Sequence, residues 1–259
     1  MNFFYDVGYI LTNYWQNFLM GVLWTLVISL IATLIGLLIG LIIGIIRTIP
    51  KSKNKAVSVF QKVVDFLLSA YIEVFRGTPM MVQALIFKYG CAALGLNWDN
   101  IRFTTAINNV LNGWFLAGLI VITFNTAAYM AEIVQSGLNG VDKGQVEGAR
   151  SLGMKSSETS FFVILPQAIR NALPTIGNEL IVNIKDSSVL NVIATTELYY
   201  RIGKISVRTY AYLEGYALLA VIYLIMTLLA ALVLKLIEKK LDGQKISLNP
   251  FARWKRSLL

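Results

Sequence analysis

The sequence contains no histidine, and its one cysteine is Cys91. Without histidine, the chain cannot build a Ser-His-Asp triad, a histidine metal site or a histidine proton relay. A single thiol cannot close an internal disulfide and is a poor metal site, so Cys91 is expected to pack as a small apolar residue near a helix end. The sequence also has no GxxxxGK[ST] phosphate loop, and we expect no P-loop ATPase activity from this chain.

Charge is absent from residues 7–46, and 56% of the 259 residues are hydrophobic, which is too apolar for an ordinary soluble domain. The net charge of +9 comes from basic clusters at 47–62, at 143–170 and after Lys235, with long apolar runs between them. This alternation follows the positive-inside rule for membrane proteins. It argues against nucleic acid as a partner and predicts membrane lipid as the surroundings.

The pattern predicts an all-α integral membrane protein, with residues 1–259 forming a single transmembrane domain. Five transmembrane helices are expected at about 17–46, 76–93, 113–138, 175–196 and 215–238. The N-terminus is expected outside and the C-terminus in the cytoplasm. The first segment has no basic start and no cleavage site, so it is expected to stay in the mature protein.

Residues 56–76 carry polar side chains at spacings of three and four, which predicts one amphipathic helix along or oblique to the membrane interface. Its end is expected to lengthen the short span at 76–93. In the first span, Gly36, Gly40 and Gly44 repeat on one helix face. Such a face favours close packing of another helix; the alternative is a locally flexible span.

The span at 175–196 is unusually polar. Glu179, Asn183 and Asp186 share one helix face, and charge at the centre of a bilayer is costly, so these residues must be shielded or line a water-filled path. An ion pair between Lys185 and Asp186 is the alternative. Near the inner end of the third span, Glu132 either is solvated at the interface or faces the pathway, with Tyr129 close by in sequence.

Residues 142–168 form a polar loop between apolar segments. Asp142 is placed to cap a short helix that ends near Leu152, and Gly153 suits the left-handed conformation common at helix ends. A second short helix is expected from about Ser157, until Pro166 blocks it and starts another. This elbow is either a compact knob that another protein grips or an ordinary inter-helix loop.

The spacing of this loop resembles the EAA loop of bacterial ABC-importer permeases: Glu-Ala-Ala, three residues, Gly, nine residues, then Ile-x-Leu-Pro. Gly148 replaces the middle residue and Val163 replaces the isoleucine, with the spacing intact. The resemblance implies a fold of the type I importer permease with a short cytoplasmic coupling helix. It also implies that the following residues dock an ATPase: Glu147, Gly148, Ala149, Gly153, Leu165 and Pro166.

Two further segments resemble the polar amino acid (glutamine, histidine or cystine) branch of these permeases. One is Arg-Gly-Thr-Pro at 76–79 followed by Gln83; the alternative is that these residues simply end one helix and start the next. The other is Lys-Asp-Ser-Ser at 185–188 followed by Glu197-Leu198. Asp186 and nearby hydroxyls would receive the ammonium of an amino acid. The expected substrate-pathway residues are Arg76, Thr78, Tyr129, Glu132, Glu179, Asn183, Lys185, Asp186, Ser187 and Ser188.

The resemblance implies several partners: ABC ATP-binding subunits, a second permease subunit of the same or a related sequence, an extracytoplasmic solute-binding protein and an amino acid substrate. ATP and Mg would belong to the ATPase, with no cofactor, metal or enzyme activity in this chain. The expected location is the bacterial cytoplasmic membrane. An ion-driven secondary transporter is the main alternative, although no inverted repeat is visible. A membrane enzyme is less consistent with the sequence, which offers no convergent nucleophile and base.

Overall fold

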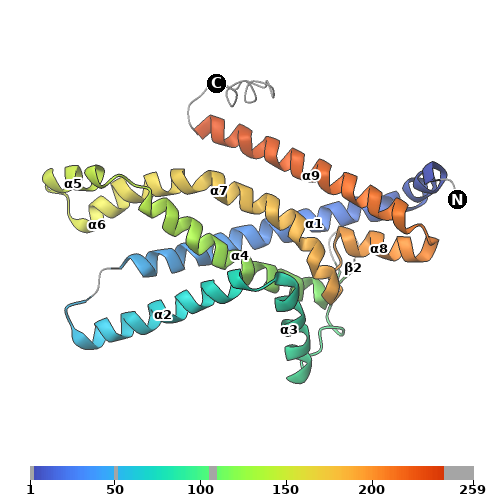
Figure 1. Cartoon of the computed structure of the whole chain (residues 1–259), viewed down its shortest axis with the longest axis horizontal. Helices are drawn as coiled ribbons and strands as arrows, with labels where there is room; N and C mark the ends of the chain where they lie inside the picture. The colour runs from blue at the N-terminus through green and yellow to red at the C-terminus, as the bar shows by residue number, and fades with distance from the viewer. Residues whose placement is uncertain (1–2, 50–51, 105–109, 242–259) are drawn as a thin grey trace.

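A computed structural model describes residues 3–49, 52–104 and 110–241. Its long helices are α1 (Phe3–Thr48), α2 (Lys55–Gly77), α4 (Gly113–Asn139), α7 (Leu165–Asp186) and α9 (Tyr212–Leu241). They run roughly along the long axis of the molecule, with α1 and α4 packed together and α7 against both α4 and α9 (Figure 1). The chain folds as a helical bundle, as the sequence predicts.

Shorter elements connect these helices. They are α3 (Met80–Ala93), β1 (Arg102–Thr104), β2 (Val110–Asn112), α5 (Lys143–Ser151), α6 (Ser156–Thr159), the π-helix η1 (Ser160–Ile164), the 3-10 helix η2 (Ser187–Ile193) and α8 (Leu198–Thr209). Strands β1 and β2 pair antiparallel, with Phe103 opposite Leu111. This small hairpin is a departure from an entirely helical chain.

Three helices within the described residues are long and apolar enough to cross a membrane: α1, α4 and α9. Helix α7 has the length, but polar side chains reduce its hydropathy, and α3 is apolar but has only 14 residues. Two of the expected spans do not coincide with single helices. Helix α7 runs over Leu165–Asp186 and tightens into η2, and the backbone is extended at Thr78, between α2 and α3.

Helix α2 confirms the amphipathic helix predicted at 56–76, and it shows where the polar stripe points. Arg47 of α1 donates a hydrogen bond to Asp65 (3.2 Å) and another to Ser69 (3.2 Å), while Phe60 and Phe66 are exposed on the apolar side. Part of the polar stripe therefore contacts α1, while Ile72 packs beside it against Ile43 and Ala131. The exposed apolar side chains suit a helix surrounded by lipid.

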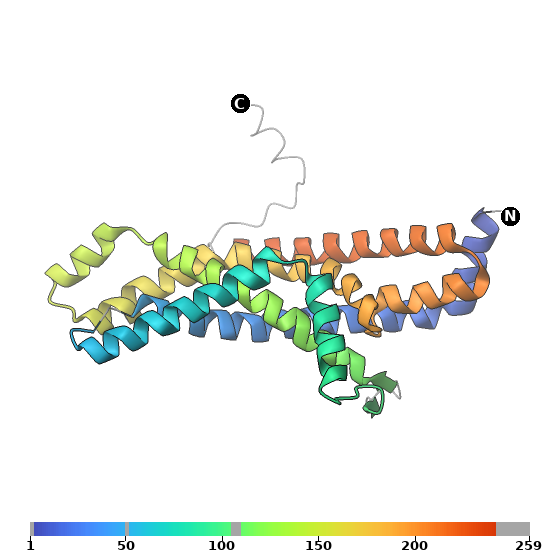
Figure 2. The same ribbon diagram turned by 60° about the horizontal axis from the view of Figure 1, so that its bottom comes forward.

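Helices α2 and α3 do not form one continuous helix. Thr78 and Pro79 both adopt extended backbone, and α3 turns sharply away from α2 (Figures 1 and 2). Proline has no amide proton and disfavours helical geometry at the residue before it, so the helix must stop here.

The contact between α1 and α4 depends on the glycine face of α1. A Cβ added at Gly40 would lie 2.6 Å from the Cβ of Met130, and one at Gly36 would lie 2.9 Å from the Cγ2 of Thr126. At Gly44 it would lie 2.7 Å from Val134. Each glycine therefore faces α4 at a distance that leaves no room for a side chain, which is the close approach that small residues permit in membranes.

Candidate functional site

Helices α5 and α6 project beyond the long helices at one end of the molecule (Figure 2). Asp142 caps α5, because its Oδ1 accepts a hydrogen bond from the Gly144 amide (2.6 Å) in the extended conformation typical of an N-cap. The cap predicted from the sequence is therefore present. It fixes the point at which the chain leaves α4 and enters the projection.

Gly153 ends α5 in the left-handed conformation, with φ +83°. The Gly153 amide donates to the Arg150 carbonyl (2.9 Å), and the Met154 amide donates to the Ala149 carbonyl (3.2 Å). These two bonds form a Schellman motif, which satisfies carbonyls left free at the helix end. Nothing lies within 4 Å of a Cβ added to Gly153, so the backbone conformation, not lack of space, demands glycine.

The second half of the projection differs from the sequence-based expectation. Residues 156–186 form one continuous helical run through α6, η1 and α7, so Pro166 does not block the helix. It lies in the first turn of α7, directly after the π-helical segment. A π turn is wider than an α turn, so it accommodates the proline without breaking the chain direction. The helical structure of the elbow is interrupted once, at Gly153.

Within the projection, Ala149 is buried, whereas Glu147, Gly148 and Pro166 are exposed and Leu165 is half-buried. Leu152, at the tip, is 85% exposed. Of the six residues expected to dock a partner, Glu147, Gly148, Ala149 and Gly153 therefore lie on α5 or at its end, and Leu165 and Pro166 lie in the first turn of α7. Ala149 packs inside the elbow, and the apolar side chain of Leu152 lies at its end. Exposed apolar groups at a rigid tip are typical of a protein-binding surface.

A second group of residues lies between α2 and α4. Arg76 forms an ion pair with Glu132, and its guanidinium lies 5.4 Å from the ring centroid of Tyr129. Three residues that the sequence placed on the pathway are thus brought together. Both side chains of the ion pair are partly exposed.

Thr78 lies beside this ion pair and forms hydrogen bonds that hold the local structure. Its hydroxyl donates to the Val74 carbonyl (2.7 Å), and the side-chain amide of Gln83 donates to both Thr78 and the Phe75 carbonyl. Asn125 of α4 in turn donates to the Oε1 of Gln83 (3.0 Å). This network fixes the α2–α3 elbow on α4 and accounts for glutamine following the Arg-Gly-Thr-Pro segment.

Asn183 lies at the meeting point of three helices. It donates to the hydroxyl of Thr33 on α1 (2.9 Å) and accepts from the hydroxyl of Thr126 on α4 (3.0 Å). Asn183 is only 2% exposed. In this structure its amide forms hydrogen bonds between helices, and its place on the substrate pathway stays a prediction.

The remaining polar residues at the end of α7 differ in how far they are exposed. Glu179 and Ser187 are buried, Asp186 and Ser188 are half-buried, and Lys185 is exposed. The hydroxyls of Ser187 and Ser188 donate to carbonyls three residues earlier, at 2.9 Å and 2.6 Å, where α7 tightens into η2. An ion pair between Lys185 and Asp186, the alternative considered above, is not formed in the described part of the chain.

Glu197 is the polar residue whose position the sequence reasoning missed, having noted it only in the family resemblance. It is fully buried and accepts hydrogen bonds from Thr25 (3.3 Å), Tyr223 (2.8 Å) and the amides of Tyr199 and Tyr200 (both 2.9 Å). It caps α8 and ties it to α1 and α9. The cap is local, but Thr25 and Tyr223 lie far away in the sequence, so no local pattern signals these contacts. Groups of acidic and cysteine residues able to hold a metal ion are not found among the described residues.

Comparison with known proteins identifies the family of this chain. Residues 55–243 match the family described as "Binding-protein-dependent transport system inner membrane component". The chain is 32% identical to the probable glutamine ABC transporter permease protein GlnM of Bacillus subtilis over 72% of its length and 79% of that protein. It is 33% identical to the arginine transport system permease protein ArtQ of the same organism, over 72% and 79%.

A solved structure, described as the crystal structure of an amino acid ABC transporter with histidines, is also similar. It shares 36% sequence identity and superimposes with a TM-score of 0.74 over 93% of this chain and 99% of that one. The family match covers the α5–α6 projection as well as helices α2 to α9. The chain is therefore a multi-pass membrane protein that belongs to the family of binding-protein-dependent transport system inner membrane components.

Proposed function

We propose that this chain is the permease subunit of an ATP-driven ABC importer and forms part of the pathway for a polar amino acid. The observation that carries the proposal is the rigid elbow of α5, capped at Asp142 and ended by a Schellman motif at Gly153. Its residues match the EAA pattern, and the names of the relatives refer to glutamine and arginine transport. A polar amino acid is the substrate class that these relatives share.

The partners follow from the family and from what the sequence lacks. The chain contains no phosphate loop, so energy comes from separate ATP-binding subunits that hold ATP and Mg. On this proposal each α5 elbow sits in a groove of one ATPase, and ATP-driven closure of the ATPases draws two permease subunits together. An extracytoplasmic solute-binding protein delivers the amino acid. The N-terminus then lies outside, and the elbow and the C-terminus lie in the cytoplasm of a bacterial cell.

Arg76, Tyr129 and Glu132 are the residues we place nearest the pathway, because this ion pair joins two helices and stays partly exposed. Lys185 and Asp186 are a second candidate pair of contacts, at the end of α7. Their charges have opposite signs, which suits a substrate that carries both a carboxylate and an ammonium group.

Uptake into proteoliposomes separates this proposal from an ion-driven transporter. The purified complex would be reconstituted with its binding protein, and entry of labelled glutamine and arginine would be measured with ATP or a non-hydrolysable analogue on the side of the elbow. We expect uptake of one of the amino acids that requires ATP hydrolysis and is unaffected by ionophores. Uptake driven by a proton or sodium gradient without ATP would overturn the proposal.

A further inference from the structure

A groove of about 760 Å³ runs beside the α5–α6 projection, between the ends of α1 and α4 and the first half of α7. Three residues described above, Val134, Arg150 and Leu165, lie on its wall. Its size falls in the range of small-molecule and cofactor sites, and its lining is mostly apolar with a few polar groups, as in such sites. The lining therefore has the composition of a binding site.

The polarity of the lining changes in the same direction along α1 and α4. On α1 it passes from Leu41 and Ile45 to Thr48, and on α4 it passes from Leu138 to Asn139. On α7 the lining is apolar as far as Ile176. The groove thus has an apolar interior that lies among the long helices and a polar mouth at their ends. The two parts of the groove match the apolar tail and the polar head of an amphiphilic ligand.

The mouth carries a positive charge and hydroxyl groups. Arg150, Ser156, Ser157 and Ser160 lie there, and all four are exposed. Within the described residues Arg150 takes part in no ion pair, since the pairs there join Arg47 to Asp65 and Arg76 to Glu132. An arginine with neighbouring hydroxyls presents several hydrogen-bond donors with geometry suited to a phosphate group.

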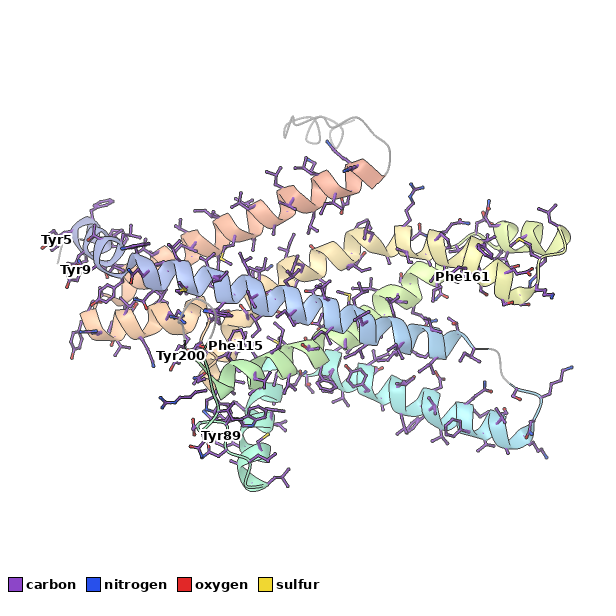
Figure 3. All side chains as sticks on the ribbon, turned by 180° about the vertical axis from the view of Figure 1, so that it is seen from behind. Tyr5, Tyr9, Tyr89, Phe115, Phe161 and Tyr200 are labelled. Atoms are coloured by element: carbon purple, nitrogen blue, oxygen red, sulfur yellow. The ribbon has the colours of Figure 1, made fainter. Side chains whose placement is uncertain are left out.

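The length of the apolar part matches one lipid tail. From Leu165 to Ile176 the wall formed by α7 covers twelve residues, roughly 16 Å from first to last at the rise of an α-helix. The hydrocarbon core of a bilayer is about 30 Å thick, so one leaflet is about 15 Å deep. Phe161 lies at the entrance to this part, at the opposite end of the molecule from Tyr5 and Tyr9 (Figure 3).

We propose that this groove binds an anionic phospholipid, with the phosphate at Arg150 and the three serines and one acyl chain along α7. Basic pockets between membrane helices at the cytoplasmic surface commonly hold anionic headgroups. The lipid would contact α5 through Arg150 and α7 through its chain, so it would brace the elbow against the bundle. The proposal is independent of which solute is transported.

Native mass spectrometry of the full-length chain, purified with the subunits that accompany it, tests this binding directly. Delipidated protein would be titrated with phosphatidylglycerol or phosphatidylcholine of identical acyl chains. We expect phosphatidylglycerol to be retained in preference, and Arg150→Gln to reduce that preference about five-fold, the equivalent of about 1 kcal/mol per basic residue. Lys143→Gln, which removes a charge from the same helix outside the groove, should leave the preference unchanged.

A second variant tests the chain-binding part without touching the charge. Ile169 lines the groove and is 48% exposed, so Ile169→Trp should fill the space and reduce retention of both lipids. Ile225→Trp, at a similarly exposed position on α9, serves as its control. Equal retention of both lipids by the wild-type protein, equal effects of Arg150→Gln and Lys143→Gln, or full displacement of the lipid by glycerol phosphate would overturn the proposal. So would loss of the lipid whenever the ATP-binding subunits are attached, because those subunits would then cover the groove.

Discussion

Asn183 of α7 donates a hydrogen bond to the hydroxyl of Thr33 on α1 across 2.9 Å, in a part of the bundle closed to solvent. The same side chain accepts a hydrogen bond from Thr126 on α4, so one amide connects three helices. In a membrane such polar contacts help to hold helices together, because lipid provides no hydrophobic driving force between them.

Replacement of Asn183 by leucine should destabilise the bundle. It removes two buried hydrogen bonds, and interhelical hydrogen bonds in membranes contribute about 0.6 kcal/mol each on average and up to about 1.7. We expect a loss of about 1–3 kcal/mol in detergent unfolding, while Asn178→Leu, at an exposed position of the same helix, should have little effect. Unchanged stability together with a raised KM for the amino acid would show instead that Asn183 contacts substrate.

Gly40→Leu should separate α1 from α4. The new Cβ would lie 2.6 Å from the Cβ of Met130 and 2.7 Å from the Ala131 amide nitrogen, and a backbone atom cannot move aside as a flexible side chain can. Overpacking of this kind typically costs about 1–3 kcal/mol. A fall in the melting temperature of the purified protein would measure it. Gly8→Leu, on the same helix with nothing within 4 Å, is the control; an equal fall in both variants would refute the packing account.

The ion pair between Arg76 and Glu132 offers a charge-swap test. Because both side chains are partly exposed, the pair should contribute only about 0.2–1 kcal/mol to stability, and its main role should be in transport. We expect Arg76→Glu and Glu132→Arg each to reduce ATP-dependent uptake, and the double variant to recover much of it. A double variant no better than the single ones would mean that one of these charges acts on the substrate, not on the other.

The elbow at Gly153 can be tested through its backbone conformation. Asparagine tolerates a positive φ better than other side chains, whereas tryptophan there is strained and bulky. Gly153→Asn should therefore retain most uptake, and Gly153→Trp should abolish it with membrane insertion intact. Gly90→Trp, at an open position in α3, is the matched control. Normal uptake by the Gly153→Trp protein would remove the docking role assigned to this elbow.

The sequence was most informative where structure depends on near neighbours. The Asp142 cap, the left-handed Gly153 and the amphipathic α2 all follow from side chains a few residues apart, and all three are present. Pro166 was misjudged because its effect depends on the π turn before it, which no simple residue pattern specifies. In that case a local rule was overridden by the geometry of the adjoining turn.

Polar residues in the bundle were harder to place, because their roles depend on which helices meet. Asn183 shares a face with Glu179 in the sequence pattern, but its partners come from α1 and α4. Glu197 collects partners from α1 and α9 that no spacing rule connects. Periodicity predicted a polar face on α2, whereas only the contacts with Arg47 show that part of this face reaches α1.

Copurification tests the central claim most directly. The chain would be tagged, extracted gently from membranes and analysed for stoichiometric partners, beside a Gly153→Trp protein. We predict that the wild-type chain brings down an ATP-binding subunit and either a second copy of itself or a related permease, and that Gly153→Trp loses the ATP-binding subunit alone. Recovery of the wild-type chain without any ATP-binding subunit, under conditions that keep such complexes intact, would contradict the account.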